Sequence, residues 1–486
     1  MQNLWPELNN EQSSPDSAGQ VQESHRRRRL TEQLLLSSLR DWLLHDYVVP
    51  YCRALSASRI YRRCYWIDAL GNIETRSNAK DTNQSREVER SGEGHVLDKS
   101  ALYCGHPAIP SILQPIVSLA DVLAQEGKTI ALHGIVLEAG SSKRKETTPS
   151  INRAPTINRG ATAEGEQSGN NHVTASAKAA NVLPQESGIV RASWLAIAPA
   201  MLDLIGQSPA VFLLNPFGHT LFTYDDLAPL YQRTAPTELC LFISHKQVMT
   251  HLTAAKGSAA HLAPARGGPT INQGPTLTAL LRSDRWKSHD KSGYLSPGQG
   301  SYIDGEAMER AIDGVIDLLI ASMQRHFLSV QRIALPVQIR PAVVETAPYT
   351  LIFATRRQDS LANMNDAVCL YRRRLHEQSR RGVLAEEWFA TQQQERFAEE
   401  MQQLYRRVLQ QGHAQRIRRW PDLRQQLLNA DFGHYSVHEY DEVVQQLLAS
   451  GDVRCEWRRR SPTEAGAEMG SEERPIPGNE DVLLWK

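Results

Sequence analysis

Polar residues that could bind a ligand follow three of the strands that the hydrophobic pattern predicts, at the point where each strand ends. Asp68 and Gly71 stand at the end of the strand predicted at residues 65–70, Glu138 follows the strand at 129–137, and Asn215 follows the strand at 211–214. Because open α/β sheets bind their ligands beyond the carboxyl ends of the strands, we expect these four residues to lie along one edge of a sheet.

The groups at each position indicate which chemistry they could serve. A carboxylate after the second strand, such as Glu138, can accept hydrogen bonds from both hydroxyls of a ribose. After the strand at residues 211–214, the side chain of Asn215 and the next carbonyl could hold an exocyclic amine, while the ring of Phe217 stacks on a base. Pro216 would fix this loop so that the groups are presented rigidly. The candidate catalytic residues are therefore Asn215, Pro216 and Phe217, and the candidate cofactor-binding residues are Asp68, Gly71 and Glu138.

Each position also has an interpretation that involves no ligand. Asp68 could cap a helix or belong to a loop, and Glu138 could be a solvated strand end before a polar segment. The sequence Asn-Pro of residues 215–216 is common in ordinary turns. The residues alone leave both interpretations open.

The elements that would position these residues are alternating helices and strands. Apolar runs predict strands at residues 65–70, 129–137, 211–214, 238–244, 332–340 and 349–355. Helical periodicity separates most of these runs, which indicates parallel βαβ units. The last two runs are joined by a loop too short for a parallel crossover, so they must be antiparallel. The pattern predicts an α/β fold with a Rossmann-like, mostly parallel sheet and an antiparallel terminal hairpin, the plan of class I methyltransferases.

Changes in composition predict the domain boundaries. Residues 1–25 are polar and are expected to be disordered, and residues 26–375 are expected to form the Rossmann domain. Two low-complexity stretches within it, 139–188 and 255–300, are interpreted as insertions because their composition cannot bury a core. Residues 376–414, rich in Gln, Glu and Arg with helical spacing, predict a helical linker.

The last segment, residues 415–486, has its own order of elements: helix, helix and two short strands. Gly451 stands where the second helix would end. This order is consistent with a small winged-helix-like domain. Arginines that flank its elements could contact a phosphate backbone, or could form solvated helix faces, and they are Arg416, Arg418, Arg419, Arg458, Arg459 and Arg460.

The composition excludes several classes of protein. The 54 Lys and Arg balance 54 Asp and Glu, so net charge indicates no class of partner. The six cysteines have no CxxC spacing, which is typical of neither a disulfide framework nor a zinc site, and no metal site is expected. No apolar run approaches the roughly 18 residues that span a bilayer, so no membrane partner is expected and a cytoplasmic location is predicted.

The order of the motifs resembles that of the three-Cys-motif partner proteins. In chain order the motifs are YWIDALG, a GHP segment before a helix, IVLEAG, FLLNPFG, LFIS, LRSDRW and YTLIFAT. The similarity covers roughly residues 30–375 without the two insertions, and the order of the whole set carries it. Members of this bacterial family have a methyltransferase-like Rossmann domain. They are encoded next to a protein with a three-cysteine motif that resembles radical-SAM enzymes.

The resemblance implies a methyltransferase-like protein that uses S-adenosylmethionine, acts on an amino group in nucleic acid, DNA or RNA, and has a three-Cys-motif protein as its partner. Three positions depart from the family. Residues 188–190 (GIV) lack the acidic residue that the family places there to meet the adenine amine. Residues 69–72 (ALGN) replace the glycine-rich turn after the first strand, and Asn215 replaces an aspartate. The alternative is therefore a catalytically degenerate scaffold or nucleic-acid-binding protein that acts with a partner encoded nearby.

Overall fold

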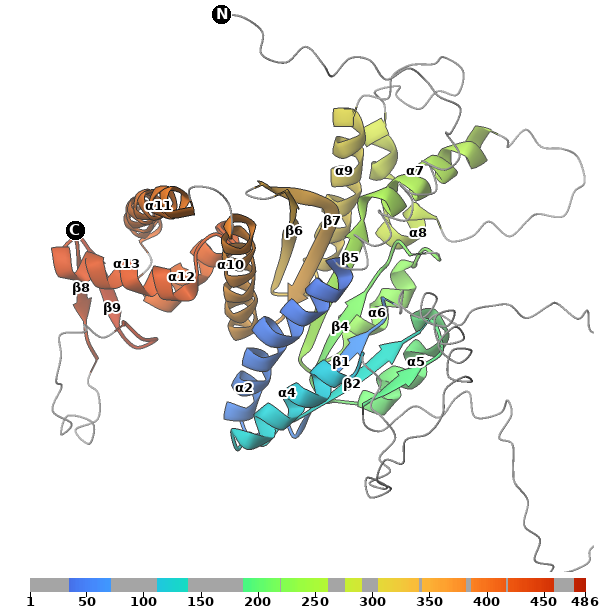
Figure 1. The fold of residues 1–486 in the computed structure, drawn as a ribbon, viewed down its shortest axis with the longest axis horizontal. Coiled ribbons are helices and arrows are strands. Elements are labelled where there is room, and N and C mark those ends of the chain that lie inside the picture. Colours follow the sequence, from blue (N-terminus) through green and yellow to red (C-terminus); the bar gives the residue numbers. More distant parts are fainter. Residues whose placement is uncertain are drawn as a thin grey trace, which may run out of the picture.

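The chain is built around a seven-stranded mixed sheet, followed by a smaller group of helices with a two-stranded hairpin (Figure 1). The structure is a computed structural model. It describes residues 35–70, 112–138, 187–218, 220–260, 276–290, 305–340, 343–381, 386–416, 418–458 and 476–486.

The large sheet has the strand order β3-β2-β1-β4-β5-β7-β6. Its strands are β1 (Arg63–Asp68), β2 (Ala131–Leu137), β3 (Gly188–Val190), β4 (Ala210–Leu214), β5 (Thr237–Ser244), β6 (Ser329–Arg340) and β7 (Val343–Thr355). β1 to β5 pair in parallel, and β7 is antiparallel to both β5 and β6. The fold is therefore Rossmann-like and mostly parallel, and the antiparallel pairing predicted for the last two strands is confirmed.

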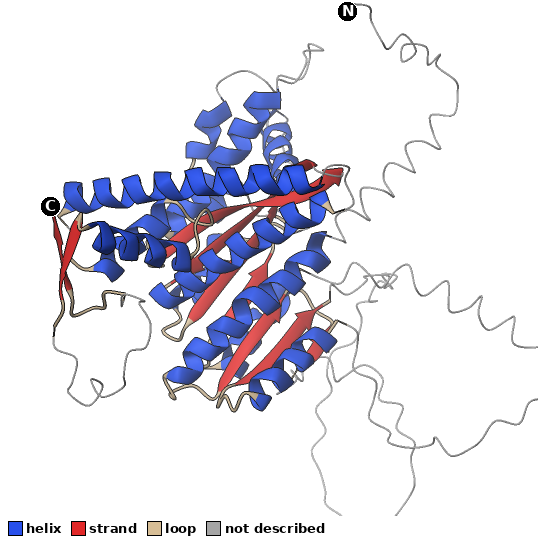
Figure 2. Cartoon of the chain, turned by 60° about the vertical axis from the view of Figure 1, so that its left-hand side comes forward, coloured by secondary structure: helices blue, strands red, loops and turns tan. Residues whose placement is uncertain are grey.

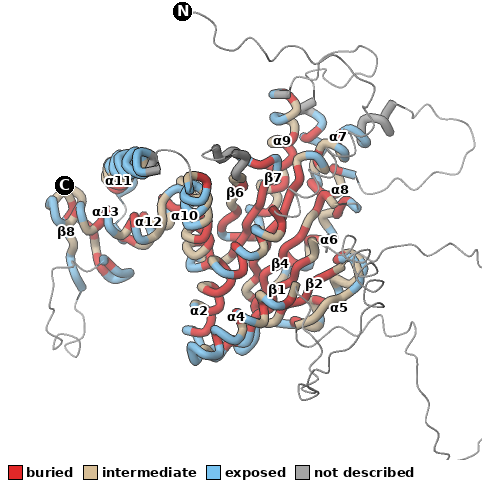
Figure 3. Tube along the Cα trace, in the orientation of Figure 1, coloured by how far each residue is buried: buried red, intermediate tan, exposed pale blue. Residues whose placement is uncertain are grey.

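Helices cover both faces of this sheet (Figure 2). Successive strand residues point to opposite faces, and in β1 Ile67 packs in one core while Trp66 packs in the other. The first face is covered by α5 (Trp194–Ile205), α6 (Tyr224–Gln232), α7 (His245–Ala260), α8 (Leu277–Leu281) and α9 (Gly305–Met323). The second face is covered by the helical residues 35–42, the π-helix η1 (Leu43–Val48), α2 (Val49–Ala57), α4 (Gln114–Gln125) and α10 (Gln358–Arg380). The central strands are buried along their length, as Figure 3 shows.

The second predicted insertion, 255–300, is shorter than the composition suggested. Residues 276–290 lie within it, yet they form α8 and the 3₁₀ helix η4 (Arg285–Asp290). Leu277, Leu280 and Trp286 of this segment are buried in the first core. Leu277, Leu280 and Leu281 form a short apolar face. The average composition of residues 255–300 is polar, so this face does not stand out in it. Residues 139–186, most of the first insertion, lie outside the described residues, as do residues 1–25.

A close contact between α4 and β2 depends on one glycine. A Cβ atom at Gly134 would lie 2.4 Å from the Cδ1 atom of Ile116, so a larger residue would require the Ile116 side chain or the helix to shift. This approach places the first turn of α4 beside the carboxyl end of β1.

The C-terminal part of the chain has a core of its own. It consists of α11 (Glu386–Gln415), α12 (Trp420–Ala430), α13 (Val437–Ser450), β8 (Val453–Glu456) and β9 (Val482–Trp485). The second half of α11 contributes Leu404 and Val408, and the hairpin contributes Val453 and Leu483. This group lies beyond α10 in Figure 1.

Three consecutive arginines of α10 bind two distant parts of the chain. Arg372 Nη1 donates a hydrogen bond of 2.9 Å to the carbonyl of Gly433, which lies between α12 and α13. Arg373 pairs with Glu439 of α13, and Arg374 binds both carboxylate oxygens of Asp46 in η1. A run of three arginines usually forms a solvated helix face. Here the run joins the N-terminal helix, residues 35–57, and the C-terminal group to α10.

Candidate functional site

A cavity of about 230 Å³ lies at the carboxyl end of β1, between the N-terminal helix and the first turn of α4. It is lined by Ser37, Arg40, Asp41, Leu44, Trp66, Asp68, Ile112, Pro115, Ile116 and Val136. This is the sheet edge at which the sequence predicted ligand binding. Gly71, the second candidate after β1, lies outside the described residues.

Asp68 lines this cavity but is held by groups of the protein itself. Its side chain is 1% exposed, and its Oδ2 accepts a hydrogen bond of 2.5 Å from Nε of Arg40, which is 14% exposed. Its Oδ1 accepts a hydrogen bond of 3.0 Å from the backbone nitrogen of Leu70. A buried carboxylate requires such partners, because desolvation without them costs several kcal/mol. A ligand that uses this carboxylate would have to compete with Arg40 or share it.

Glu138 lies on the same sheet edge as Asp68. Asp68 is the register partner of Val136, and Glu138 follows two residues later, so both acidic residues belong to the same face of the sheet. The backbone nitrogen of Glu138 donates a hydrogen bond of 2.9 Å to the carbonyl of Val190 in β3. The Oε2 atom of Glu138 lies 3.8 Å from Nε of Arg191. The structure therefore places the two acidic candidates for cofactor binding on the same edge and face of the sheet, although only Asp68 lines the cavity.

The turn after β4 is occupied by internal hydrogen bonds. Asn215 Oδ1 accepts from the backbone nitrogen of Phe217 at 3.1 Å, and Nδ2 donates to Oε1 of Gln247 at 3.0 Å. The carbonyl of Pro216 accepts from the backbone nitrogen of Phe222 at 2.9 Å. The groups expected to hold an exocyclic amine thus already have partners, although an amide oxygen and a carbonyl can each accept a second hydrogen bond.

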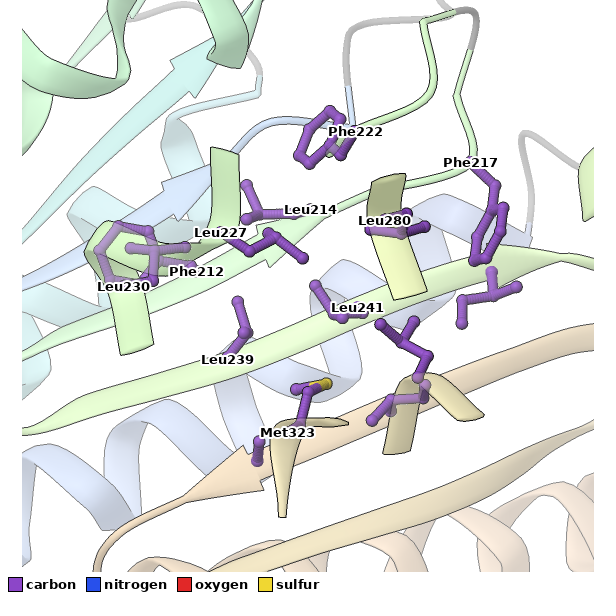
Figure 4. Packing of buried hydrophobic residues seen from close by; sticks show 14 of the residues in the cluster. Phe212, Leu214, Phe217, Phe222, Leu227, Leu230, Leu239, Leu241, Leu280 and Met323 are labelled. Atoms are coloured by element: carbon purple, nitrogen blue, oxygen red, sulfur yellow. The ribbon is translucent and has the colours of Figure 1, made fainter. Parts of the chain in front are cut away.

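The ring of Phe217 does not have the free face that base stacking requires. It is 0% exposed and belongs to the first core, near Leu280 of α8 (Figure 4). The expected stacking role is therefore incompatible with the conformation that the structure shows. The physical reason is that the ring belongs to an apolar core that α7, α8 and α9 also join, which makes its burial favourable.

Sequence reasoning missed Arg40 as a member of this site. Leu36, Leu43 and Tyr47 are buried at helical spacing, and Arg40 stands in the same stripe. A charge within an apolar stripe is a signal that a buried partner is needed, and Asp68 is that partner.

The arginines of the C-terminal segment lie on two neighbouring connections. Arg416, Arg418 and Arg419 are exposed between α11 and α12, and Arg458 is exposed two residues after β8. The carbonyl of Arg418 accepts a hydrogen bond of 2.7 Å from the backbone nitrogen of Leu483 in β9. Arg459 and Arg460 lie outside the described residues.

Other classes of site have no support within the described part of the chain. It contains no group of three or more His, Cys, Asp or Glu residues that could hold a metal ion. No helix in the same part is long and apolar enough to cross a membrane. Comparison with protein-family models, with curated proteins and with solved structures gave no match.

Proposed function

We propose that this chain is a methyltransferase-like protein of the three-Cys-motif partner type that binds S-adenosylmethionine at the carboxyl edge of β1 and β2. The observation that carries the proposal is the strand order β3-β2-β1-β4-β5-β7-β6 with an antiparallel β7. This order is that of class I methyltransferases, and it supports the resemblance that the motifs suggest. Fold alone does not define function, so the residues at the edge must also suit the cofactor.

The residues after β1 and β2 suit the cofactor better than those after β4. Glu138 offers a carboxylate for the ribose hydroxyls, and Asp68 lines the adjoining cavity. Arg40 also lines that cavity, where it is paired with Asp68. When bound, S-adenosylmethionine supplies the methyl group, and the protein's contribution to such a transfer is mainly to align donor and acceptor.

The target of methylation in this proposal is an amino group in nucleic acid. Asn215 keeps an amide oxygen that can accept from an amine, and its Nδ2–Gln247 bond would hold the amide in one orientation. The buried ring of Phe217 leaves the base without a stacking partner at this turn, so recognition of the base would need other groups.

Calorimetric titration of S-adenosylmethionine and S-adenosylhomocysteine into the full chain tests the proposal. We expect micromolar binding that Glu138→Gln weakens by about tenfold, because the amide lacks the negative charge and keeps only one of the two oxygens that can accept from the ribose hydroxyls. Asp203→Asn, at an exposed position on α5, is the matched control and should bind as the natural chain does. Absence of heat with both ligands, from a folded protein, would contradict the proposal.

The C-terminal group fits a winged-helix domain, which supports the nucleic-acid part of the proposal. A winged helix has the order helix, strand, helix, helix, strand, wing, strand, and its first strand pairs with the last. Here α11 is followed by residue 418, which pairs with β9, and then by α12, α13, β8 and β9. β8 pairs with β9 in an antiparallel manner, so β9 lies between residue 418 and β8.

A second candidate function is a non-catalytic scaffold on the same fold. The observation that favours it is the turn after β4, where Asn215, Pro216 and Phe217 all serve the protein's own packing and hydrogen bonds. The two functions differ in the titration described above, since a scaffold with a decayed site binds neither ligand.

A further inference from the structure

The first turn of α13 is bound to the large domain rather than free to enter a groove of nucleic acid. Asn365 of α10 accepts from the backbone nitrogen of Gly433 and donates to the carbonyl of Tyr435, both at 2.8 Å. Asp366 Oδ1 accepts from the backbone nitrogen of Val437, the first residue of α13, at 2.7 Å. By its place in the order of elements, α13 is the helix that would read bases in a winged helix.

The charge of α13 also disfavours insertion into a groove. The helix, Val437–Ser450, contains no lysine or arginine, and its exposed residues include His438, Glu442 and Gln446. Glu439 is buried and paired with Arg373 of α10. A groove between two rows of phosphates would repel such a helix.

The opposite side of the C-terminal group offers a different surface. Val453 and Leu483 point into the core. Successive strand residues point to opposite faces, so the residue after each of them points outward. Arg454 and its register partner Leu484 are both exposed on this outer face. Trp457, just after β8, is 45% exposed.

Exposed arginines also lie in the connection between α11 and α12 and just after β8. We define the hairpin surface as Arg416, Arg418, Arg419, Arg454, Trp457 and Arg458, all of which are exposed. Glu456 is the exposed acidic residue within β8. Arginines beside an exposed aromatic ring form the combination that contacts phosphates and stacks on nucleobases or sugars.

We propose that this chain binds nucleic acid through the hairpin surface, by contacts to the phosphate backbone, and not by insertion of α13. The inference rests on the winged-helix part of the proposed function and gives it a face and a mode of binding. Backbone contacts carry no direct sequence information, so binding should depend steeply on salt and little on sequence.

The test is fluorescence anisotropy of the full chain with labelled duplexes of about 20 base pairs, at salt concentrations of about 50 and about 200 mM. Two unrelated DNA sequences and the corresponding RNA duplexes distinguish DNA from RNA as the source of the phosphates. The variant is R418E/R419E/R454E, which reverses three exposed charges. The matched control is H438A/Q446A, which changes exposed residues of α13.

We expect the charge-reversal variant to lose affinity by at least about tenfold and to show a shallower dependence on salt. The control should bind within about twofold of the natural chain, and the two sequences should bind alike. Loss of binding in the α13 variant, clear preference for one sequence, or no binding of any duplex at low salt would overturn the proposal. Titration of S-adenosylmethionine into the same variants separates this outcome from failure of the cofactor site, since the hairpin surface lies in another part of the chain.

Discussion

Arg40 and Asp68 form a buried ion pair that joins the N-terminal helix to the carboxyl end of β1, with Nε 2.5 Å from Oδ2. The two residues are 28 positions apart in sequence, and both line the cavity at the proposed cofactor edge. The position of the N-terminal helix therefore determines whether the Asp68 carboxylate in this cavity is paired with a cation.

Replacement of Arg40 by methionine should destabilise the protein. The variant leaves the Asp68 carboxylate buried without its cation, which we expect to lower the free energy of unfolding by about 3 kcal/mol. The double variant Arg40→Met/Asp68→Asn should recover part of this loss, since it removes both charges. Urea denaturation measures both quantities, and equal stability of the single variant and the natural chain would rule out a structural role for the pair.

Replacement of Phe217 by alanine distinguishes a core residue from a base-stacking residue. Because the ring is fully buried beside Leu280, we expect a loss of about 3 to 5 kcal/mol in the free energy of unfolding. Phe397→Ala, at an exposed position of α11, is the matched control and should cost much less. If Phe217→Ala left the thermal midpoint unchanged, the ring would not be part of the core.

A buried acid should make stability depend on pH. Burial raises the pKa of the Glu238 carboxyl to about 7, although the Ser360 hydroxyl donates to its Oε1 at 3.0 Å. An unfolded glutamate has a pKa of about 4.3. Between these values the folded state holds more protons than the unfolded state. The contribution of this carboxyl to the free energy of unfolding is thus complete below the unfolded pKa. It is lost as the pH rises through the folded pKa, by about 4 kcal/mol in total.

Glu238→Gln removes this titration. In denaturation experiments between pH 4 and pH 8, roughly the window set by the two pKa values, the natural chain should lose stability with rising pH while the variant changes less. Parallel curves for the two proteins would show that another group is responsible.

Replacement of Asn365 by alanine should loosen the C-terminal group from α10. The change leaves the backbone nitrogen of Gly433 and the carbonyl of Tyr435 without their partner, at a cost of about 2 kcal/mol. Hydrogen exchange at the Gly433 amide should be faster in this variant than in Gln446→Ala, an exposed control on α13. Unchanged exchange at Gly433 would mean that Asn365 does not hold the two parts together.

The sequence predicted the sheet better than it predicted the site. Apolar runs located β1, β2, β4 and β5 because buried parallel strands are continuous hydrophobic segments, and the short link between the last two strands required their antiparallel pairing. The partners of the polar residues could not be read in the same way. Arg40 pairs with Asp68, and Phe217 joins a core with residues of α8. Both depend on segments that are distant in the chain, which neither periodicity nor spacing encodes.

The measurement that tests the central claim most directly is photo-crosslinking of methyl-labelled S-adenosylmethionine to the full chain, followed by mapping of the labelled peptides. The proposal predicts label on peptides that contain β1 and the N-terminal helix, or β2 and Glu138, and competition by S-adenosylhomocysteine. No specific label, or label confined to the C-terminal group of helices, would contradict a cofactor site at the carboxyl edge of β1 and β2.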